Sequence, residues 1–209
     1  MAARRLPMFP LGTVLLPRAH LPLHIFEPRY RALIKDVLAG DGEFGVVLIE
    51  RGQEVGGGDA RFAVGTVARV VQTAELPDGR WLVDAVGTGR FRVTEWLPDD
   101  PYPVALIEPV EDDYDSTGTE AGERRTAVER LLRQVLALQV ELGFPAPSAV
   151  RRLDDDPATA SFEAASLSPI GPMDSQKLLE APGTVARLRL LEDLLGEARD
   201  ILTRRIADA

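Results

Sequence analysis

The spacing of apolar residues changes near residue 111 of this 209-residue chain, and that change limits the folds open to it. Before residue 111, short β-rich runs alternate with turn residues, a pattern typical of strands. After it, apolar residues recur every three or four positions, which predicts amphipathic helices. We therefore expect an α+β protein with a β-rich subdomain at residues 1–115 and a helical subdomain at residues 116–209.

Seven runs in the first part are predicted strands, at residues 13–16, 21–25, 44–49, 62–73, 80–86, 91–96 and 104–110. Leu-Pro-Asp-Gly-Arg at 76–80 predicts a hairpin, because Asp and Gly tolerate the dihedral angles of a tight turn. The glycines of residues 86–91 lie between two predicted strands and indicate a bulge or a tight bend. The glycine-rich stretch 54–61 predicts a flexible connection.

Prolines interrupt the apolar stretch at residues 9–30, which also contains both histidines of the chain. A signal peptide or a membrane-spanning helix needs an unbroken apolar run, so we expect a soluble, cytoplasmic protein without membrane contact. Pro28 suits the first turn of a helix, apolar residues follow it at helical spacing, and Gly40 can end it. A helix is therefore predicted over residues 28–40.

An acidic, glycine-containing stretch at residues 111–123 is expected to form an exposed linker. Helices are predicted at residues 120–142, 147–153, 157–167 and 173–180, and a long one from Thr184 towards Ala209. Thr184 is the expected cap of the last helix. Packing within a helical bundle explains the apolar stripe of that helix, and a homo-oligomer formed through it is the alternative.

The residue composition and the absence of known motifs exclude most kinds of catalytic site. Cysteine is absent, which excludes disulfides, thiolate zinc sites, iron–sulfur clusters and a cysteine nucleophile. His20 and His24, with Glu27 as a nominal third ligand, fall short of a zinc site, so we expect surface or capping histidines and no metal. Neither a G-x-S-x-G elbow nor a phosphate-binding loop occurs. We predict no cofactor, no catalytic residue and no enzymatic activity.

The formal net charge of −9 bears on partners. An acidic surface repels phosphate groups, so we expect no binding to nucleic acid.

Three stretches together resemble the amino-terminal substrate-binding domain of the ATP-dependent Lon proteases. They are LPMFPLGTVLLPRAHLPLHIFEPRYRALI at 6–34, FAVGTVARVVQTAELPDGRWLVDAVGTGRFRV at 62–93 and DSQKLLEAPGTVARLRLLEDLL at 174–195. The resemblance implies a PUA-like, partly open β-barrel with one helix, followed by a helical bundle that ends in a long helix. Full-length Lon continues into an ATPase module and a Ser/Lys peptidase. Because this chain ends at Ala209, the resemblance predicts neither activity for it.

The resemblance leads to a functional hypothesis: a stand-alone Lon-type domain that recognises polypeptide segments and serves a protease or chaperone as an adaptor in protein quality control. Exposed aromatic side chains and an unpaired strand edge would provide the contacts. The candidate peptide-binding residues are Phe26, Glu27, Arg29, Tyr30, Trp81, Trp96 and Tyr102. The alternative for the aromatic residues is that they fill the core. The alternative functions are a PUA-like RNA-binding module and a small-ligand-binding module.

Overall fold

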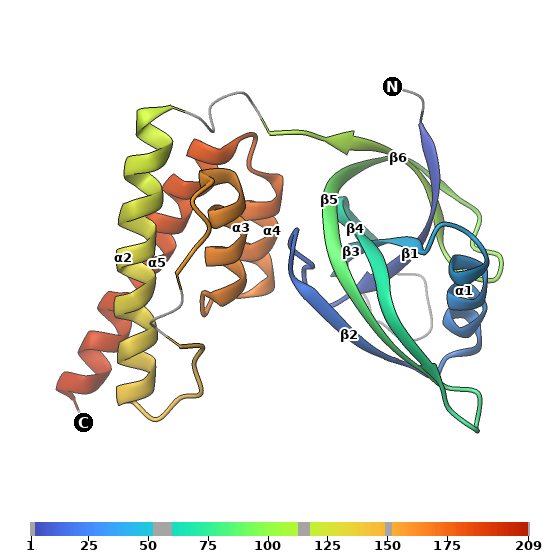
Figure 1. Cartoon of the computed structure of the whole chain (residues 1–209), viewed down its shortest axis with the longest axis horizontal. Coiled ribbons are helices and arrows are strands. Elements are labelled where there is room, and N and C mark those ends of the chain that lie inside the picture. Colours follow the sequence, from blue (N-terminus) through green and yellow to red (C-terminus); the bar gives the residue numbers. More distant parts are fainter. Residues whose placement is uncertain (1–2, 52–59, 113–117, 149–151, 209) are drawn as a thin grey trace. The chain divides into compact units, whose positions relative to one another are not determined.

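The computed structural model describes residues 3–51, 60–112, 118–148 and 152–208. The chain divides into two compact units, Met1–Val110 and Glu111–Ala209. We call them the β-rich unit and the helical unit, and each is described by itself (Figure 1).

In its described residues, 3–51 and 60–110, the β-rich unit contains six strands and one helix. They are β1 (Arg4–Leu11), β2 (His20–Ile25), α1 (Pro28–Ala39), β3 (Glu43–Arg51), β4 (Ala60–Glu75), β5 (Trp81–Leu97) and β6 (Val104–Val110). The strands form one sheet in the order β2-β5-β4-β3-β1-β6, and β5 also pairs with β6. The predicted α+β class is confirmed. The pairing of β5 with β6 closes the sheet on itself, but the sheet is not a regular barrel. Strand β2 lies outside this closed part and, among the described residues, pairs with β5 alone.

The predicted hairpin at residues 76–80 is confirmed and joins β4 to β5. The Leu76 carbonyl accepts a hydrogen bond from the Gly79 N–H at 2.8 Å, and the Leu76 N–H donates to the Arg80 carbonyl at 2.8 Å. Gly79 has φ +77°, a value that glycine adopts without a steric penalty. The turn therefore has the residue that its geometry requires.

One strand prediction was wrong. Residues 13–16 are not a strand, and the first strand is β1, which lies earlier in the chain. The strands predicted at 80–86 and 91–96 are confirmed from Trp81 onward, but they form a single strand, β5. The predicted bulge is confirmed inside that strand, because Val67 pairs with Gly89 and Ala68 with Gly87, which leaves Thr88 as an extra residue.

Helix α1 packs its buried face against the sheet. Tyr30, Leu33, Ile34 and Val37 are buried in one core cluster with residues of the surrounding strands. A second, smaller cluster lies around Phe91. The helical prediction for this segment is confirmed, with Pro28 in the first turn and Gly40 as the C-cap.

The helical unit contains α2 (Thr119–Glu141), α3 (Pro157–Leu167), α4 (Pro172–Glu180) and α5 (Thr184–Ala207). Helices α2 and α5 lie side by side (Figure 1). Four of the five predicted helices are confirmed. The predicted helix at 147–153 is not formed at its described residues 147–148 and 152–153. No helix in the described part of the chain is both long and apolar enough to cross a membrane.

The predicted cap of α5 was wrong. Gly183 occupies the N-cap position, and the Thr184 hydroxyl instead donates to Asp112 Oδ2 at 2.8 Å. Two other predictions fall partly on undescribed residues. The connection predicted at 54–61 is described only at 60–61, where β4 begins, and the linker predicted at 111–123 lacks residues 113–117 and ends inside α2.

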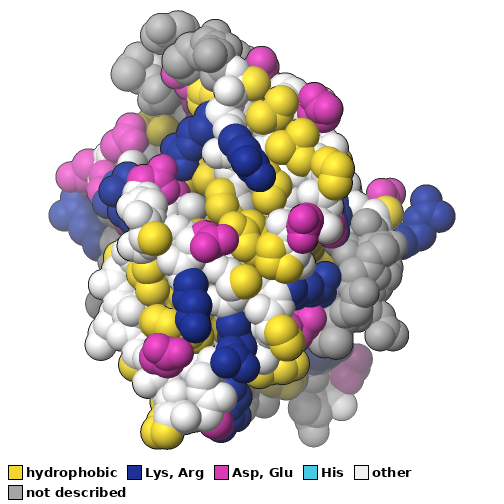
Figure 2. All heavy atoms as spheres, turned by 90° about the vertical axis from the view of Figure 1, so that its right-hand side faces the viewer, with side chains coloured by type: hydrophobic (Ala, Val, Ile, Leu, Met, Phe, Trp, Pro, Cys, Tyr) yellow, Lys and Arg dark blue, Asp and Glu magenta, His cyan; other side chains and the backbone are white. Residues whose placement is uncertain are grey.

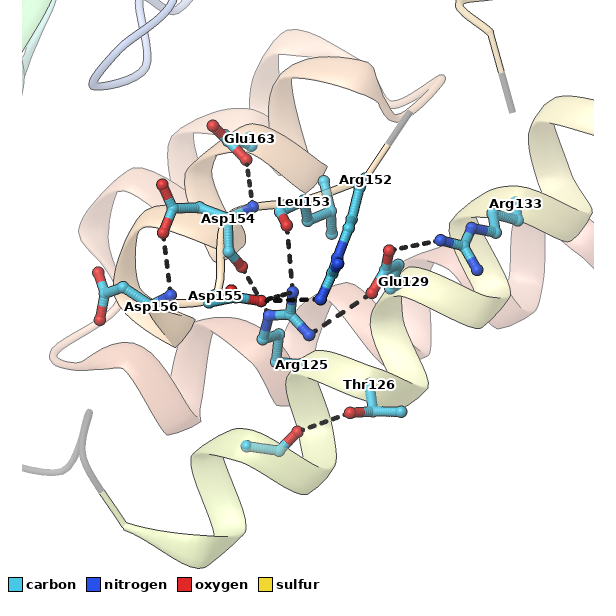
Figure 3. A network of polar contacts seen from close by, with 11 residues as sticks. Arg125, Thr126, Glu129, Arg133, Arg152, Leu153, Asp154, Asp155, Asp156 and Glu163 are labelled. Atoms are coloured by element: carbon cyan, nitrogen blue, oxygen red, sulfur yellow. Dashed lines mark hydrogen bonds and ion pairs between the residues drawn. The ribbon is translucent and has the colours of Figure 1, made fainter. Parts of the chain in front are cut away.

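Arg125 of α2 holds the segment that precedes α3 (Figure 3). Its guanidinium donates to the Asp154 carbonyl at 2.6 Å and to the Leu153 carbonyl at 3.1 Å, and pairs with Asp155 at 3.3 Å. Glu129, one turn along α2, pairs with the same guanidinium at 3.5 Å. The network fixes this segment to α2 through charge-assisted hydrogen bonds.

Candidate functional site

Strand β2 lies at one end of the sheet. Its side chains alternate between the two faces, with Leu21 and Ile25 in the core and Pro22 and His24 exposed. Proline is tolerated here because an edge strand makes ladder hydrogen bonds on one side only. Within the described residues, β2 therefore presents an unpaired strand edge.

An open groove crosses the outer face of β2, β5 and β4. Strand register places two rows of side chains there: His24, Leu82 and Ala74 in one row, and Pro22, Asp84 and Gln72 in the next. These six residues line a groove of about 410 Å³, which we call the β2 groove. Leu82 is 46% exposed, so an aliphatic side chain of the groove faces solvent.

Of the carboxylates in the described part of the chain, Asp84 alone lines the β2 groove. His20, on the same face of the neighbouring strand, has its Nδ1 atom 3.3 Å from Asp84 Oδ2, and both side chains are partly exposed. The groove therefore suits apolar side chains accompanied by a basic group and disfavours phosphate. Within the described residues, no cluster of three or more His, Asp or Glu side chains is placed to hold a metal ion.

Three of the predicted site residues lie where β2 leads into α1. The outward alternation of Pro22 and His24 continues to Phe26, which is 55% exposed. Glu27 is the N-cap residue of α1, and its Oε2 atom lies 3.0 Å from Arg29 Nε. This exposed ring beside an ion pair is available to a partner.

The two predicted tyrosines are buried. Tyr30 is 4% exposed and stacks on Phe9 with ring centroids 4.1 Å apart. Tyr102 is 8% exposed, and its hydroxyl donates to Asp36 Oδ2 at 2.6 Å. Burial raises the pKa of Tyr102 to about 12, and the hydrogen bond to Asp36 acts in the same direction. Both rings belong to the larger core cluster.

The two tryptophans are half-buried and lie in different places. Trp81 pairs in register with Ile25 and packs against the larger core cluster. Its Nε1 hydrogen has no acceptor among the described residues. Trp96 pairs with Ala105 and packs against the smaller cluster, with the Arg61 guanidinium 4.6 Å from its ring centroid. Trp81 therefore lies beside the β2–α1 junction, and Trp96 belongs to another part of the sheet.

Leu82, Asp84 and Gln72 were not among the residues predicted from sequence, although they line the groove. The alternation of residues 81–86 contained the signal, since every second side chain of a strand shares one face. The sequence alone does not show which of the two alternating sets of side chains points outward. That depends on how the strand pairs with its neighbours.

The face of the β-rich unit that carries α1 has different side chains from the β2 groove (Figure 2). Its apolar side chains form a broken band interrupted by basic and acidic side chains, and no histidine is visible on it. Leu38 of α1, which does not line the groove, is 41% exposed. It provides a matched apolar position for control experiments.

Known proteins resemble this chain over most of its length. Lon protease 2 of Myxococcus xanthus is 33% identical over 200 residues, which cover 94% of this chain and 24% of that protein. Lon protease of Anaeromyxobacter dehalogenans is 34% identical over the same shares of the two chains. The chain thus spans about a quarter of the length of these relatives.

Two solved structures share the fold. The Lon N-terminal domain protein from Xanthomonas campestris matches with a TM-score of 0.63 and 31% identity, covering 90% of this chain and 96% of that one. The N-terminal domain of Mycobacterium avium complex Lon protease matches with a TM-score of 0.67 at 19% identity, over 92% and 98% of the two chains. The family model of the ATP-dependent protease La (LON) substrate-binding domain matches residues 5–197. The chain therefore belongs to the Lon substrate-binding domain family.

Proposed function

We propose that this chain is a stand-alone, non-catalytic polypeptide-binding domain that holds unfolded or degron-like segments in the β2 groove. One observation carries the proposal: Leu82 is 46% exposed in a groove beside an edge strand, and Phe26, at 55% exposure, directly follows that strand. Exposed apolar side chains grouped in this way are typical of interaction sites. Family membership supports a polypeptide as the occupant.

An extended segment suits this surface because β2 can accept another strand. Main-chain hydrogen bonds to a strand edge bind many sequences, and side-chain pockets add selectivity. Among the residues predicted from sequence, we assign direct contact to Phe26 and a flanking role to Glu27, Arg29 and Trp81.

The binding test uses a labelled, reduced and carboxymethylated protein that cannot fold, with affinity measured by fluorescence anisotropy. Full burial of a Leu or Phe side chain contributes roughly 1.5–3 kcal/mol, and each of these is about half exposed, so each is expected to contribute about 1 kcal/mol. The variant Phe26→Ser/Leu82→Ser should therefore bind about thirtyfold more weakly.

Leu38→Ser is the matched control, because it removes a similarly exposed apolar side chain that does not line the groove. It should retain the affinity of the unaltered chain. Equal affinity in the double variant and the control would refute the assignment of the site.

We further propose that the bound segment is delivered to a protease or chaperone. Addition of the chain to a purified Lon protease and an unfolded client should accelerate degradation, and the Phe26→Ser/Leu82→Ser variant should not. Degradation at the same rate with both proteins would argue against an adaptor role.

A further inference from the structure

A second groove is formed entirely by residues of the helical unit. It lies between the carboxyl-terminal turns of α2 and α5 and has a volume of about 320 Å³. Its lining includes Gln139, Phe144, Pro169, Ala198, Ile201 and Arg205, and we call it the Arg205 groove. The volume lies at the lower end of the range for ligand pockets, roughly 300–1,000 Å³, which suits one or two side chains of a peptide.

The walls of the Arg205 groove are apolar and open to solvent. Phe144 and Ile201 are each 46% exposed, while Leu202 beside them is buried at 8%. Val140, on the last turn of α2, is 60% exposed. Large apolar side chains from two elements that meet at a groove favour contact with an apolar side chain of a partner.

The arginines at the carboxyl-terminal end of helix α5 differ from the other arginines of that helix in their ion pairing. Arg187, Arg189 and Arg199 each pair with a carboxylate. Arg204 and Arg205, in the last turn, have no carboxylate partner among the described residues, and Arg204 Nε donates to the Asp200 carbonyl at 3.2 Å. The groove thus combines apolar walls with the guanidinium of Arg205, the charged residue of its lining among the described residues. Guanidinium groups match carboxylates in both geometry and charge.

We propose that the Arg205 groove binds a peptide segment in which an apolar side chain is flanked by carboxylates. The apolar side chain lies between Phe144 and Ile201, and Arg205 pairs with a flanking carboxylate. This site is independent of the β2 groove, whose lining carboxylate is Asp84 and which therefore favours the opposite charge.

The probe is a short fluorescein-labelled peptide that alternates Leu with Glu, compared with a matched peptide that alternates Leu with Lys. The Leu–Glu peptide should bind at least tenfold more tightly, and added salt should weaken its binding because the charges are near the surface. Arg205→Gln should reduce its affinity about fivefold, the upper value for one exposed ion pair. Arg205→Lys keeps the charge at the helix end and should retain part of that affinity.

The matched control is Arg189→Gln, which removes the same charge from another exposed position of α5. It should leave the affinity for the Leu–Glu peptide unchanged, whereas Ile201→Ser should abolish most of it. Leu82→Ser should also leave it unchanged, so failure of this proposal and failure of the β2 groove are distinguishable. Circular dichroism verifies that each variant is folded.

Equal affinity for the two peptides would overturn the proposal. So would binding that neither Arg205→Gln nor Ile201→Ser alters. A third outcome is a dimer in sedimentation velocity that Ile201→Ser dissociates, with no peptide binding; a second copy would then cover the groove, and the proposal would be wrong.

Discussion

Removal of the Asp112 carboxylate is expected to destabilise the helical unit by about 3–5 kcal/mol. Its partner Arg187 has a fully buried side chain, at 0% exposure. Nη1 of Arg187 donates to Asp112 Oδ1 at 3.2 Å, and Nη2 donates to Asp112 Oδ2. The variant Asp112→Ala leaves this guanidinium buried without a counterion, and also removes the acceptor of the Thr184 hydroxyl.

The expected loss of stability follows from the contacts that Arg187 keeps in the Asp112→Ala variant. Its Nε atom donates to Ser161 Oγ at 2.7 Å, and its Cζ atom lies 3.8 Å from the centroid of the Phe162 ring. A cation–π contact contributes roughly 0.5–2 kcal/mol, which is less than the several kcal/mol that desolvation of the cation costs. For a chain of this size, each kcal/mol lowers Tm by about 2–4 °C, so the expected decrease is about 6–20 °C.

The assay is urea denaturation followed by far-ultraviolet circular dichroism, with the denaturant slope checked for constancy. Asp193→Ala is the control, because Asp193 is an exposed carboxylate on α5, the helix of Arg187. It should change the free energy of unfolding by less than about 0.5 kcal/mol. The double variant Asp112→Ala/Arg187→Met should be no less stable than Asp112→Ala alone, since it removes the orphaned cation. Additive losses, or a loss below about 1 kcal/mol for Asp112→Ala, would refute the reasoning.

Three further predictions concern single positions. Gly65→Ala should destabilise the sheet by about 1–3 kcal/mol in urea denaturation, because its Cβ atom would lie 2.3 Å from the Val46 carbonyl oxygen. Since the pKa of Tyr102 is raised from 10.0 to about 12 in the folded chain, its stabilising contribution is fully present below pH 10 and is lost as pH rises towards 12. An ultraviolet titration should show a late-ionising tyrosine whose signal Tyr102→Phe removes. Arg125→Ala should cost about 2 kcal/mol of stability in thermal denaturation, whereas the exposed Arg130→Ala on the same helix should cost about 0.5 kcal/mol or less.

The elements predicted correctly have local signals. Helix α1 has a proline in its first turn and a glycine at its end, and the β4–β5 hairpin has Asp-Gly at its turn. Strand β1 was missed because Pro7 and Pro10 argue against a strand within a sheet. The structure gives the reason that they are tolerated: Pro7 pairs only with Val104 of β6, and Pro10 only with Val47 of β3. At each proline, therefore, β1 has a partner on one side.

The candidate site was harder to predict because it depends on which face of a strand is covered. In residues 81–86 both alternating sets contain large apolar side chains, and a shift of one residue would exchange Trp81 with Leu82. Pairing with β2 and β4 determines that Leu82 faces solvent. Tyr30 shows the converse. Its helical spacing with Leu33 and Val37 already indicated a core position, and that local pattern was a better guide than its aromatic character.

The two proposed grooves carry opposite charges. A client with one segment for each groove can therefore test whether both grooves bind the same polypeptide. A basic apolar segment suits the β2 groove beside Asp84, whereas an acidic apolar segment suits the Arg205 groove. A client with both segments on a flexible linker should bind more tightly than either segment alone, because the second contact becomes intramolecular. Cleavage of the linker should remove that gain while leaving each single affinity unchanged. If cleavage has no effect, the two grooves do not hold one client together, even where each binds its own peptide.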